Sequence, residues 1–262
     1  MKGVLLAGGT GSRLHPLTKD TNKHLLPIAG RPMVEWAIEA LVGAGVTEVV
    51  VVTGPEHVDA FRALLGDGAR LGVDRLEYAV QERPGGIAEA LGLTETFADG
   101  GPIVLMLADN LLERSLGDLV AAFEKEPVGA RLLLSQMDDD EHLRHLGVPV
   151  LDAEGRITEI VEKPAAPPSA YAVTGVYCYE YSVYDVVKTL VPSGRGELEI
   201  TDVNNHFVTT GAVAYDVLEG FWGDAGESID AYYVVNDFVR RHCANRGDPA
   251  PVSGRGAAQP PS

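Results

Sequence analysis

The chain has 262 residues, 45% of them hydrophobic and 23% charged, with a formal net charge of −17 at pH 7. That hydrophobic fraction can bury a substantial core, so a globular fold is expected. An acidic chain without a concentrated basic face repels the phosphate backbone of nucleic acids, which argues against a nucleic-acid partner. Small phosphorylated ligands are not excluded, because a few converging Arg or Lys side chains or a metal ion can hold them.

Cysteine content and the apolar stretches bear on the cellular compartment. Cys178 and Cys243 are too few for a disulfide framework, and no charged and apolar leader precedes Met1. The apolar runs are strand-sized, well short of the roughly 20 residues that span a bilayer. We therefore expect a soluble, cytoplasmic protein with no membrane partner.

Hydrophobic periodicity predicts strands alternating with helices over the first half of the chain. The expected strands are residues 2–7, 48–53, 75–80, 103–108 and 130–136. The expected helices are residues 34–41, 58–65, 87–97 and 116–125. This alternation is typical of an α/β fold with a parallel sheet and crossover helices.

Beyond Asp138 the pattern changes to strands separated by short polar or proline-rich connections, which indicates a more mixed sheet. The strands expected here are residues 148–151, 157–162, 172–179 and 213–218. The helices expected here are residues 182–190, 200–209 and 229–243. Residues 246–262 are rich in Gly, Pro, Ala and Ser, so a disordered tail is expected there.

A glycine-rich loop, LAGGTGSRL, follows the first strand at residues 6–14. The carboxyl end of a strand is where an open α/β sheet binds ligands, and Gly8, Gly9 and Gly11 let backbone N–H groups approach a phosphate. The loop is not a P-loop, since Gly11 is followed by Ser and Arg, and Leu14 breaks the dinucleotide fingerprint. A tight turn without a ligand is the alternative interpretation.

Two aspartates follow or lie within short apolar segments far apart in the chain. Asp109 comes directly after the strand expected at 103–108, and Asp224 lies in the turn-like segment 220–226. Magnesium prefers a few carboxylates with substrate phosphates and water, so two aspartates suffice if the fold brings them together. A helix cap or a turn is the alternative role for each.

Residues 6–32 contain the glycine loop, an arginine and the run Lys-His-Leu-Leu-Pro that begins at Lys23. This segment resembles the signature of the sugar-phosphate nucleotidyltransferases, and residues 1–245 are similar to the short form of the glucose-1-phosphate thymidylyltransferases. The resemblance implies a Rossmann-like, mixed and mainly parallel sheet flanked by helices, with an inserted sugar-binding β-rich region. It also implies a single domain, in which about residues 1–137 bind the nucleotide and about 138–245 carry the sugar-phosphate and metal sites.

The resemblance implies an enzyme of NDP-sugar biosynthesis that joins glucose 1-phosphate to dTTP, uses Mg²⁺ and releases pyrophosphate. Arg13 and Lys23 would neutralise the triphosphate. Lys163 and Arg195 would hold the acceptor phosphate, and these four residues are the expected catalytic ones. Many relatives self-associate, so a homo-oligomer, either a dimer or a tetramer, is expected.

The family's motifs also imply individual binding residues. Asp109 and Asp224 are expected to bind Mg²⁺ against the α-phosphate. The expected nucleotide contacts are Leu6, Ala7, Gly8, Gly9, Gly11, Gln81, Gly86 and Asp109. The expected sugar-phosphate contacts are Asn110, Gly147, Glu162, Lys163, Val173, Arg195 and Trp222. The residue type itself supports Gln81, whose amide can both donate to and accept from a pyrimidine edge.

Some positions depart from the family pattern. Leu146 stands where these enzymes commonly have Tyr, His24 where Gln is frequent, Ala108 where Gly is usual, and Gly223 where a larger apolar residue is usual. Because the expected sugar pocket is altered, the same reaction with UTP or GTP and a modified sugar or cyclitol phosphate is an alternative. A non-catalytic nucleotide- or sugar-phosphate-binding regulator is the alternative of another class, and its expected mark would be loss of the charged site residues.

Overall fold

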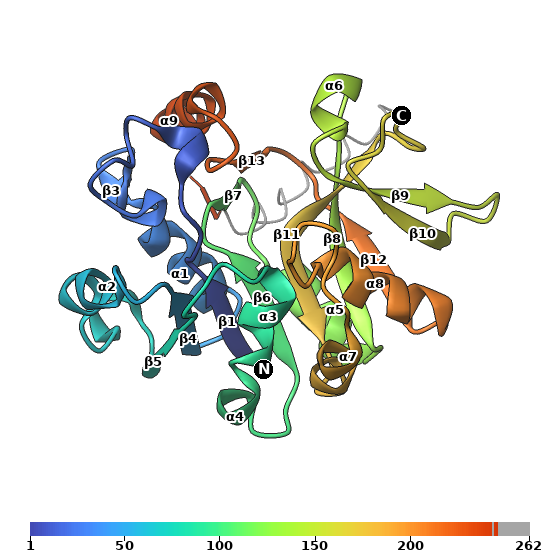
Figure 1. Ribbon diagram of the computed structural model, residues 1–262, viewed down its shortest axis with the longest axis horizontal. Helices are drawn as coiled ribbons and strands as arrows, with labels where there is room; N and C mark the ends of the chain where they lie inside the picture. Colours follow the sequence, from blue (N-terminus) through green and yellow to red (C-terminus); the bar gives the residue numbers. More distant parts are fainter. Residues whose placement is uncertain (243, 246–262) are drawn as a thin grey trace, which may run out of the picture.

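The computed structural model describes residues 1–242, 244 and 245. Within them the central element is a nine-stranded sheet with the path β10–β9–β11–β6–β1–β4–β5, and β8 and β12 extend it beside β11 (Figure 1). Its strands are β1 (Lys2–Leu6), β4 (Glu48–Thr53), β5 (Arg75–Val80), β6 (Ile103–Leu107), β8 (Ala130–Gln136), β9 (Gly147–Leu151), β10 (Ile157–Glu162), β11 (Tyr171–Tyr179) and β12 (Val213–Val217).

Strand direction divides the sheet into two regions. β1 pairs in parallel with β4 and β6, and β5 pairs in parallel with β4. β11 is antiparallel to β6, β8 and β9, and β9 and β10 form an antiparallel β-rich region at the sheet's end. The expected mixed, mainly parallel α/β fold is therefore confirmed.

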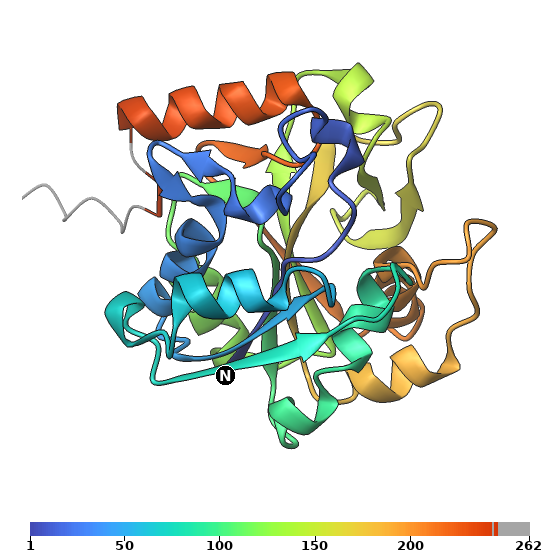
Figure 2. The same cartoon turned by 60° about the vertical axis from the view of Figure 1, so that its left-hand side comes forward.

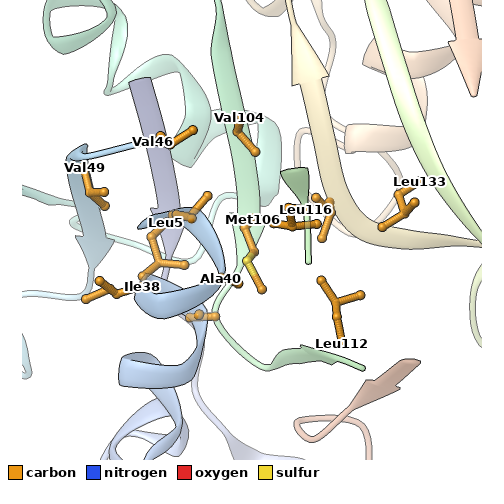
Figure 3. Packing of buried hydrophobic residues seen from close by; sticks show 14 of the residues in the cluster. Leu5, Ile38, Ala40, Val46, Val49, Val104, Met106, Leu112, Leu116 and Leu133 are labelled. Carbon is orange, nitrogen blue, oxygen red and sulfur yellow. The ribbon is translucent and has the colours of Figure 1, made fainter. Parts of the chain in front are cut away.

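Helices cover both faces of the sheet, and successive strand residues alternate between the two faces. Leu5 belongs to the hydrophobic cluster that includes α1 (Met33–Gly43), α2 (Val58–Leu65) and α5 (Gly117–Lys125). Figure 3 shows Leu5 in this cluster with Ile38 of α1 and Met106 of β6. Leu6 belongs instead to the cluster on the opposite face, which is covered by α3 (Ile87–Gly92), α7 (Val183–Thr189) and α8 (Ile200–Thr209).

The helix expected at residues 87–97 is wrong in one respect: it is divided into α3 and α4 (Glu95–Ala98). The break falls at Thr94, a buried residue whose hydroxyl bonds the Leu91 carbonyl at 2.7 Å and the Tyr184 hydroxyl at 2.9 Å. A threonine that bonds back to the preceding turn competes with the helical hydrogen bonds. Periodicity alone does not show that competition.

Two short ribbons and a short helix were not predicted. β2 (Pro27–Ile28) pairs with β3 (Arg31–Pro32), and β7 (Asn110–Leu112) pairs with β13 (Trp222–Asp224). α6 (Asp140–Leu143) precedes β9. Each is too short to leave a periodic pattern in the sequence.

The last described helix, α9 (Ile229–His242), fixes the N-terminal ribbon from above. Figure 2 shows it lying across β2 and β3, and its Tyr232 hydroxyl donates a 2.6 Å hydrogen bond to the Pro27 carbonyl. No helix within residues 1–242 is long and apolar enough to cross a membrane. Cys243, the expected last residue of this helix, and the tail expected at 246–262 lie outside the described residues.

Candidate functional site

A cleft with a volume of about 390 Å³ lies beyond the carboxyl ends of β1, β4 and β6. It gathers charged and glycine residues from both halves of the chain. The residues predicted for the site that line it are Leu6, Gly8, Gly9, Arg13, Lys23, Gln81, Gly86, Asp109, Asn110, Gly147, Glu162, Lys163, Val173, Arg195, Trp222 and Asp224. The structure therefore brings most of the predicted set into one cleft.

Ala7 and Gly11 do not line the cleft but hold its glycine loop in place. The Ala7 carbonyl accepts hydrogen bonds from Asn22 Nδ2 at 3.2 Å and Thr53 Oγ1 at 3.0 Å. The Gly11 carbonyl accepts one from Thr18 Oγ1 at 2.7 Å. Gly11 also has a φ of 63°, a left-handed conformation that favours glycine. These bonds anchor both ends of the loop and leave Gly8 and Gly9 between them at the cleft.

Asp109 and Asp224 come together because two strands distant in sequence form a ribbon. Asp224 of β13 pairs in register with Asn110 of β7, and the Ala225 N–H donates to the Asp109 carbonyl at 2.9 Å. Burial and the negative charge of Asp109 raise the pKa of Asp224 to about 7. The two carboxylates are therefore close enough for the charge of one to affect the other. The fold thus brings together the two aspartates that the sequence analysis proposed for a metal site.

Lys23 compensates this concentration of negative charge. Its Nζ lies 2.5 Å from Asp109 Oδ2. Burial opposes the charged form of Asp109, but the attraction of Lys23 overcomes it and holds the pKa of this carboxyl well below its usual range. Burial likewise opposes the charged lysine, yet Asp109 and Asp224 raise the pKa of Lys23 above its ordinary value. The acid and the base are thus both held ionised.

His24 is buried beside this pair and is neutral. Burial, together with the neighbouring charge of Lys23, lowers its pKa to about 3. Its Nδ1 lies 2.8 Å from Asn22 Oδ1, which also accepts the His24 backbone N–H at 2.9 Å. Asn22 therefore orients the imidazole and, through Ala7, the glycine loop as well. Nothing in the sequence pattern singled out Asn22.

The chemistry of this donor set fits magnesium. Within residues 1–242, 244 and 245 no three or more His, Cys, Asp or Glu side chains are grouped to hold a metal ion. Asp109 and Asp224 form a pair of neighbouring carboxylates, and Mg²⁺ typically takes one or two carboxylates with substrate phosphates and water. Gly226 keeps the space open, because a Cβ built there would lie 2.6 Å from Lys23 Nζ and would collide with Asp109 Oδ2.

Asn110 joins the acidic pair to the neighbouring strand. Its Oδ1 accepts from Trp222 Nε1 at 2.7 Å and from the Gly175 N–H at 2.9 Å, and its Nδ2 donates to Asp109 Oδ1 at 3.2 Å. All three bonds are buried. In this arrangement Asn110 positions Asp109 and Trp222, and its expected contact with the sugar phosphate stays a prediction.

The other end of the cleft is built where β9, β10 and β11 meet. Gly147 pairs with both Glu162 of β10 and Val173 of β11, so three expected acceptor residues are adjacent. Glu162 accepts a 2.7 Å bond from the Thr201 hydroxyl and lies 3.2 Å from Lys163 Nζ. Thr201 is a further lining residue that was not predicted as a contact.

Lys163 adopts a left-handed conformation with a φ of 48°, which is uncommon for a residue other than glycine. Its N–H donates to the Leu146 carbonyl at 2.9 Å. Leu146, which replaces the family's usual tyrosine, lines the cleft directly before Gly147. The backbone at this turn thus places Lys163 beside Leu146, the residue that replaces the family's usual tyrosine.

Arg195 reaches the same end from the loop that precedes α8. It forms two 3.0 Å bonds with the Glu199 carboxylate, and its Nη2 lies 3.9 Å from Glu162 Oε1. The hydrogen bond to Glu199 raises the pKa of Arg195 above its ordinary value. Lys163 and Arg195 therefore both approach Glu162 Oε1, and two cations converge on this carboxylate oxygen.

The part of the cleft where the base is expected is formed by the turn into α3. Gly86 has a φ of 97°, and a Cβ there would collide with the Leu198 carbonyl. Leu198 in turn donates to the Gly85 carbonyl at 2.8 Å and accepts from the Ala88 N–H at 3.2 Å. The Arg195 loop and the turn that carries Gln81 and Gly86 are thus packed together.

Comparison with known proteins agrees with this geometry. The profile of the nucleotidyl transferase family matches residues 2–242, and the chain belongs to this family. The predicted resemblance is therefore confirmed.

The chain is similar to several relatives over most of its length. It is 43% identical over 242 residues to a glucose-1-phosphate thymidylyltransferase of Actinoplanes sp., covering 92% of this chain and 78% of the relative. It is 38% identical over 260 residues to the low-salt glycan biosynthesis nucleotidyltransferase Agl11 of Haloferax volcanii, covering 97% and 72%. A solved structure of a candidate glucose-1-phosphate thymidylyltransferase from Bacillus anthracis superimposes with a TM-score of 0.86 at 42% identity, covering 92% and 95%.

Proposed function

We propose that this nucleotidyltransferase transfers a thymidylyl group from dTTP to glucose 1-phosphate and releases pyrophosphate. The observation that carries the proposal is the Asp109–Asp224 pair, which lines one cleft together with the glycine loop, Lys163 and Arg195. Such a site can hold two phosphorylated reactants on either side of one pair of carboxylates. Relatives named glucose-1-phosphate thymidylyltransferase support the choice of substrates.

The glycine loop holds the triphosphate in this scheme. Backbone N–H groups at Gly8 and Gly9 donate to phosphate oxygens, and Arg13 stabilises the charge on the leaving pyrophosphate. Lys23, which balances Asp109, lies within the same charged group and supplies a second cation. Gln81 and Gly86 receive the base at the neighbouring turn.

Lys163 and Arg195 hold the acceptor phosphate, and Glu162 accepts hydrogen bonds from the sugar hydroxyls. Two cations are needed because both reactants are anions that repel each other. An oxygen of the sugar phosphate attacks the α-phosphorus in line and forms the new P–O bond. The bond from the α-phosphorus to the bridging oxygen of the β-phosphate breaks, and pyrophosphate leaves with the electron pair. A phosphate monoester is already anionic near neutral pH, so no strong general base is required.

Asp109 and Asp224 are the residues that would hold Mg²⁺. A bound Mg²⁺ supplies charge neutralisation at the α-phosphate and so makes it more electrophilic. The two carboxylates concentrate negative charge at a place that is shielded from solvent, and a divalent cation complements this charge. This role also accounts for a glycine at position 226, where a side chain would fill the space between Asp109 and Lys23.

Pyrophosphate release measured with Mg²⁺ tests the proposed function. Five nucleoside triphosphates (dTTP, UTP, GTP, ATP and CTP) are each offered with glucose 1-phosphate, and then with other sugar or cyclitol phosphates. The expected result is the highest kcat/KM for dTTP with glucose 1-phosphate. A clear preference for another pair would keep the reaction but overturn the substrates, and binding without turnover across the panel would overturn the reaction.

We also propose a cytoplasmic, self-associating protein that acts as one domain over residues 1–245. The large exposed side chains of α9, Tyr233 at 56% and Val234 at 60%, support self-association because neighbouring apolar groups on a surface favour contact with another chain. Light scattering coupled to size-exclusion chromatography measures the mass directly. A monomer at micromolar concentration would contradict self-association.

A further inference from the structure

The amide of Gln81 has only one orientation that satisfies its neighbours. Its Nε2 donates to Glu89 Oε2 at 2.8 Å and to the Gly86 carbonyl at 3.2 Å. An ionised carboxylate and a carbonyl can only accept hydrogen bonds, so the amide nitrogen must face both of them. The opposite rotamer would place three acceptors against one another. The two protons of the Gln81 amide nitrogen are thereby used inside the protein.

The amide oxygen of Gln81 is left on the cleft side. Gln81 and Gly8 both line the cleft, and the position of a Cβ built at Gly8 lies 3.6 Å from Gln81 Oε1. The oxygen therefore lies beside the glycine loop. Gln81 presents an acceptor there, and its donors are already engaged.

Glu89 reaches Gln81 because position 85 has no side chain. A Cβ built at Gly85 would collide with the Glu89 carboxylate. The Glu89 side chain is 24% exposed, and its other oxygen, Oε1, lies 3.4 Å from Nε of the largely exposed Arg83. The carboxylate is therefore held between a solvent-facing cation and the buried side of the Gln81 amide.

We propose that Glu89 is a positioning residue that fixes Gln81 with its oxygen toward the cleft, so that the site selects pyrimidines carrying an N–H at ring position 3. This inference rests on the proposed function and specifies the base. Thymine and uracil donate from N3–H and match the single acceptor. Cytosine presents a lone pair at N3, which would face the lone pairs of Gln81 Oε1.

The test compares dTTP with CTP, two pyrimidine nucleotides that differ at N3 and at the exocyclic group beside it, and also at the C5 methyl group and the ribose 2′-hydroxyl. The last two differences are the same for every variant, so the change in preference from wild type to variant reports on N3 and its neighbouring group. The measured quantity is the ratio of kcat/KM for dTTP to that for CTP, with dissociation constants from titration calorimetry alongside. Glu89→Leu removes the acceptor that orients Gln81, and the ratio is expected to fall about tenfold, the value of one hydrogen bond. Glu89→Gln keeps an amide oxygen opposite Gln81 Nε2, and the ratio is expected to stay within about threefold of the wild type.

Gly85→Ala provides a second variant that leaves Glu89 in the chain. Its methyl group occupies the place of the carboxylate, so the ratio is expected to fall as in Glu89→Leu. Arg83→Ala is the matched control, because Arg83 touches only the outer oxygen of Glu89. An unchanged ratio in both Glu89→Leu and Gly85→Ala overturns the inference. An equal fall in Glu89→Gln or Arg83→Ala also overturns it, because the ratio would then follow any disturbance of the turn.

The proposed function fails separately from this inference. Wild-type protein that turns over neither dTTP nor UTP contradicts the proposed function before any variant is made. Wild-type protein that prefers dTTP, with variants that keep this preference, contradicts only the role of Glu89.

Discussion

Lys23 Nζ lies 2.5 Å from Asp109 Oδ2, so the lysine expected at the triphosphate contacts the carboxylate expected at the metal. The pair neutralises two buried charges that would each be costly alone. It also joins the N-terminal loop to the strand end at β6. A divalent cation and a polyphosphate can substitute for the two partners of this pair, one for each charge. The ion pair thus keeps both Lys23 and Asp109 ionised before substrates enter.

Asp109→Asn tests the acidic half of this relationship. The substitution preserves size and removes one carboxylate charge, and turnover is expected to fall at least ~10²-fold because one charge stabiliser is lost. Asp224 remains to balance Lys23, so the protein is expected to stay folded by circular dichroism. Asp59→Asn, at a side chain that is 95% exposed, is the control and should leave turnover unchanged. Near-normal turnover in Asp109→Asn would remove this residue from the site.

Lys163→Ala tests the acceptor end. Loss of one of the two cations beside Glu162 is expected to lower turnover at least ~10²-fold, with the KM for the sugar phosphate raised more than the KM for the nucleotide. Lys188→Ala is the control, since Lys188 pairs with Glu95 and does not line the cleft. An equal rise in both KM values would show that Lys163 does not act specifically on the acceptor.

Gly226→Ala tests the space between the acid pair and the lysine. The added methyl group must displace Asp109 or Lys23, and misplacement of a site group by about 1 Å can reduce turnover ~10²-fold. Gly43→Ala is the control, because a Cβ there meets nothing within 4 Å, and its stability is expected to stay equal or rise by about 0.5–1 kcal/mol. Full activity of Gly226→Ala would mean that this space is not used.

His142→Gln tests a pH-dependent contact between α6 and Glu227, a residue that follows β13. A hydrogen bond to Glu227 raises the pKa of His142 above its ordinary value, although burial opposes the shift. Protonated His142 therefore stabilises the folded state fully below the ordinary pKa, and this stabilisation is lost as the pH rises through the raised value. The free energy of unfolding is expected to differ between wild type and variant by about 0.5–1 kcal/mol more at about pH 5 than at about pH 9.

Denaturant titration of the same substitution in a Glu227→Gln background is the control. Without the carboxylate partner the effect of His142→Gln should be equal at both pH values. A pH-dependent difference that survives in this background would contradict the assigned pair.

The long elements of the fold could be predicted because each carries its own periodic pattern. The Val-rich run 48–53 forms the buried strand β4, and the apolar stripe starting at Ile229 forms α9. The β7–β13 ribbon could not be predicted, because three-residue strands have no period and their pairing joins residues more than a hundred positions apart. The glycine at position 223 can be explained only with the structure, because a Cβ there would lie 2.9 Å from the Phe221 ring.

Sequence motifs singled out most of the expected site residues that the structure brings to one cleft, but not the contacts among them. Motifs singled out Asp109, Asp224 and Lys23, yet no spacing indicates that Lys23 pairs with Asp109. Asn22 and Glu89 were missed because each acts through another side chain, and a single sequence does not record such contacts. The signals that could have suggested Glu89 are the adjacent Gly85, which leaves room for a carboxylate, and its position near Gln81 at the helix start.

Isotope exchange measures the central claim most directly. Labelled pyrophosphate is mixed with dTTP, Mg²⁺ and the enzyme, with and without glucose 1-phosphate, and the label in dTTP is followed. Direct transfer between two bound reactants predicts exchange that requires the sugar phosphate, because the thymidylyl group reaches no protein side chain. Rapid exchange without the sugar phosphate would contradict direct transfer, and no exchange in either mixture would contradict the proposed function itself.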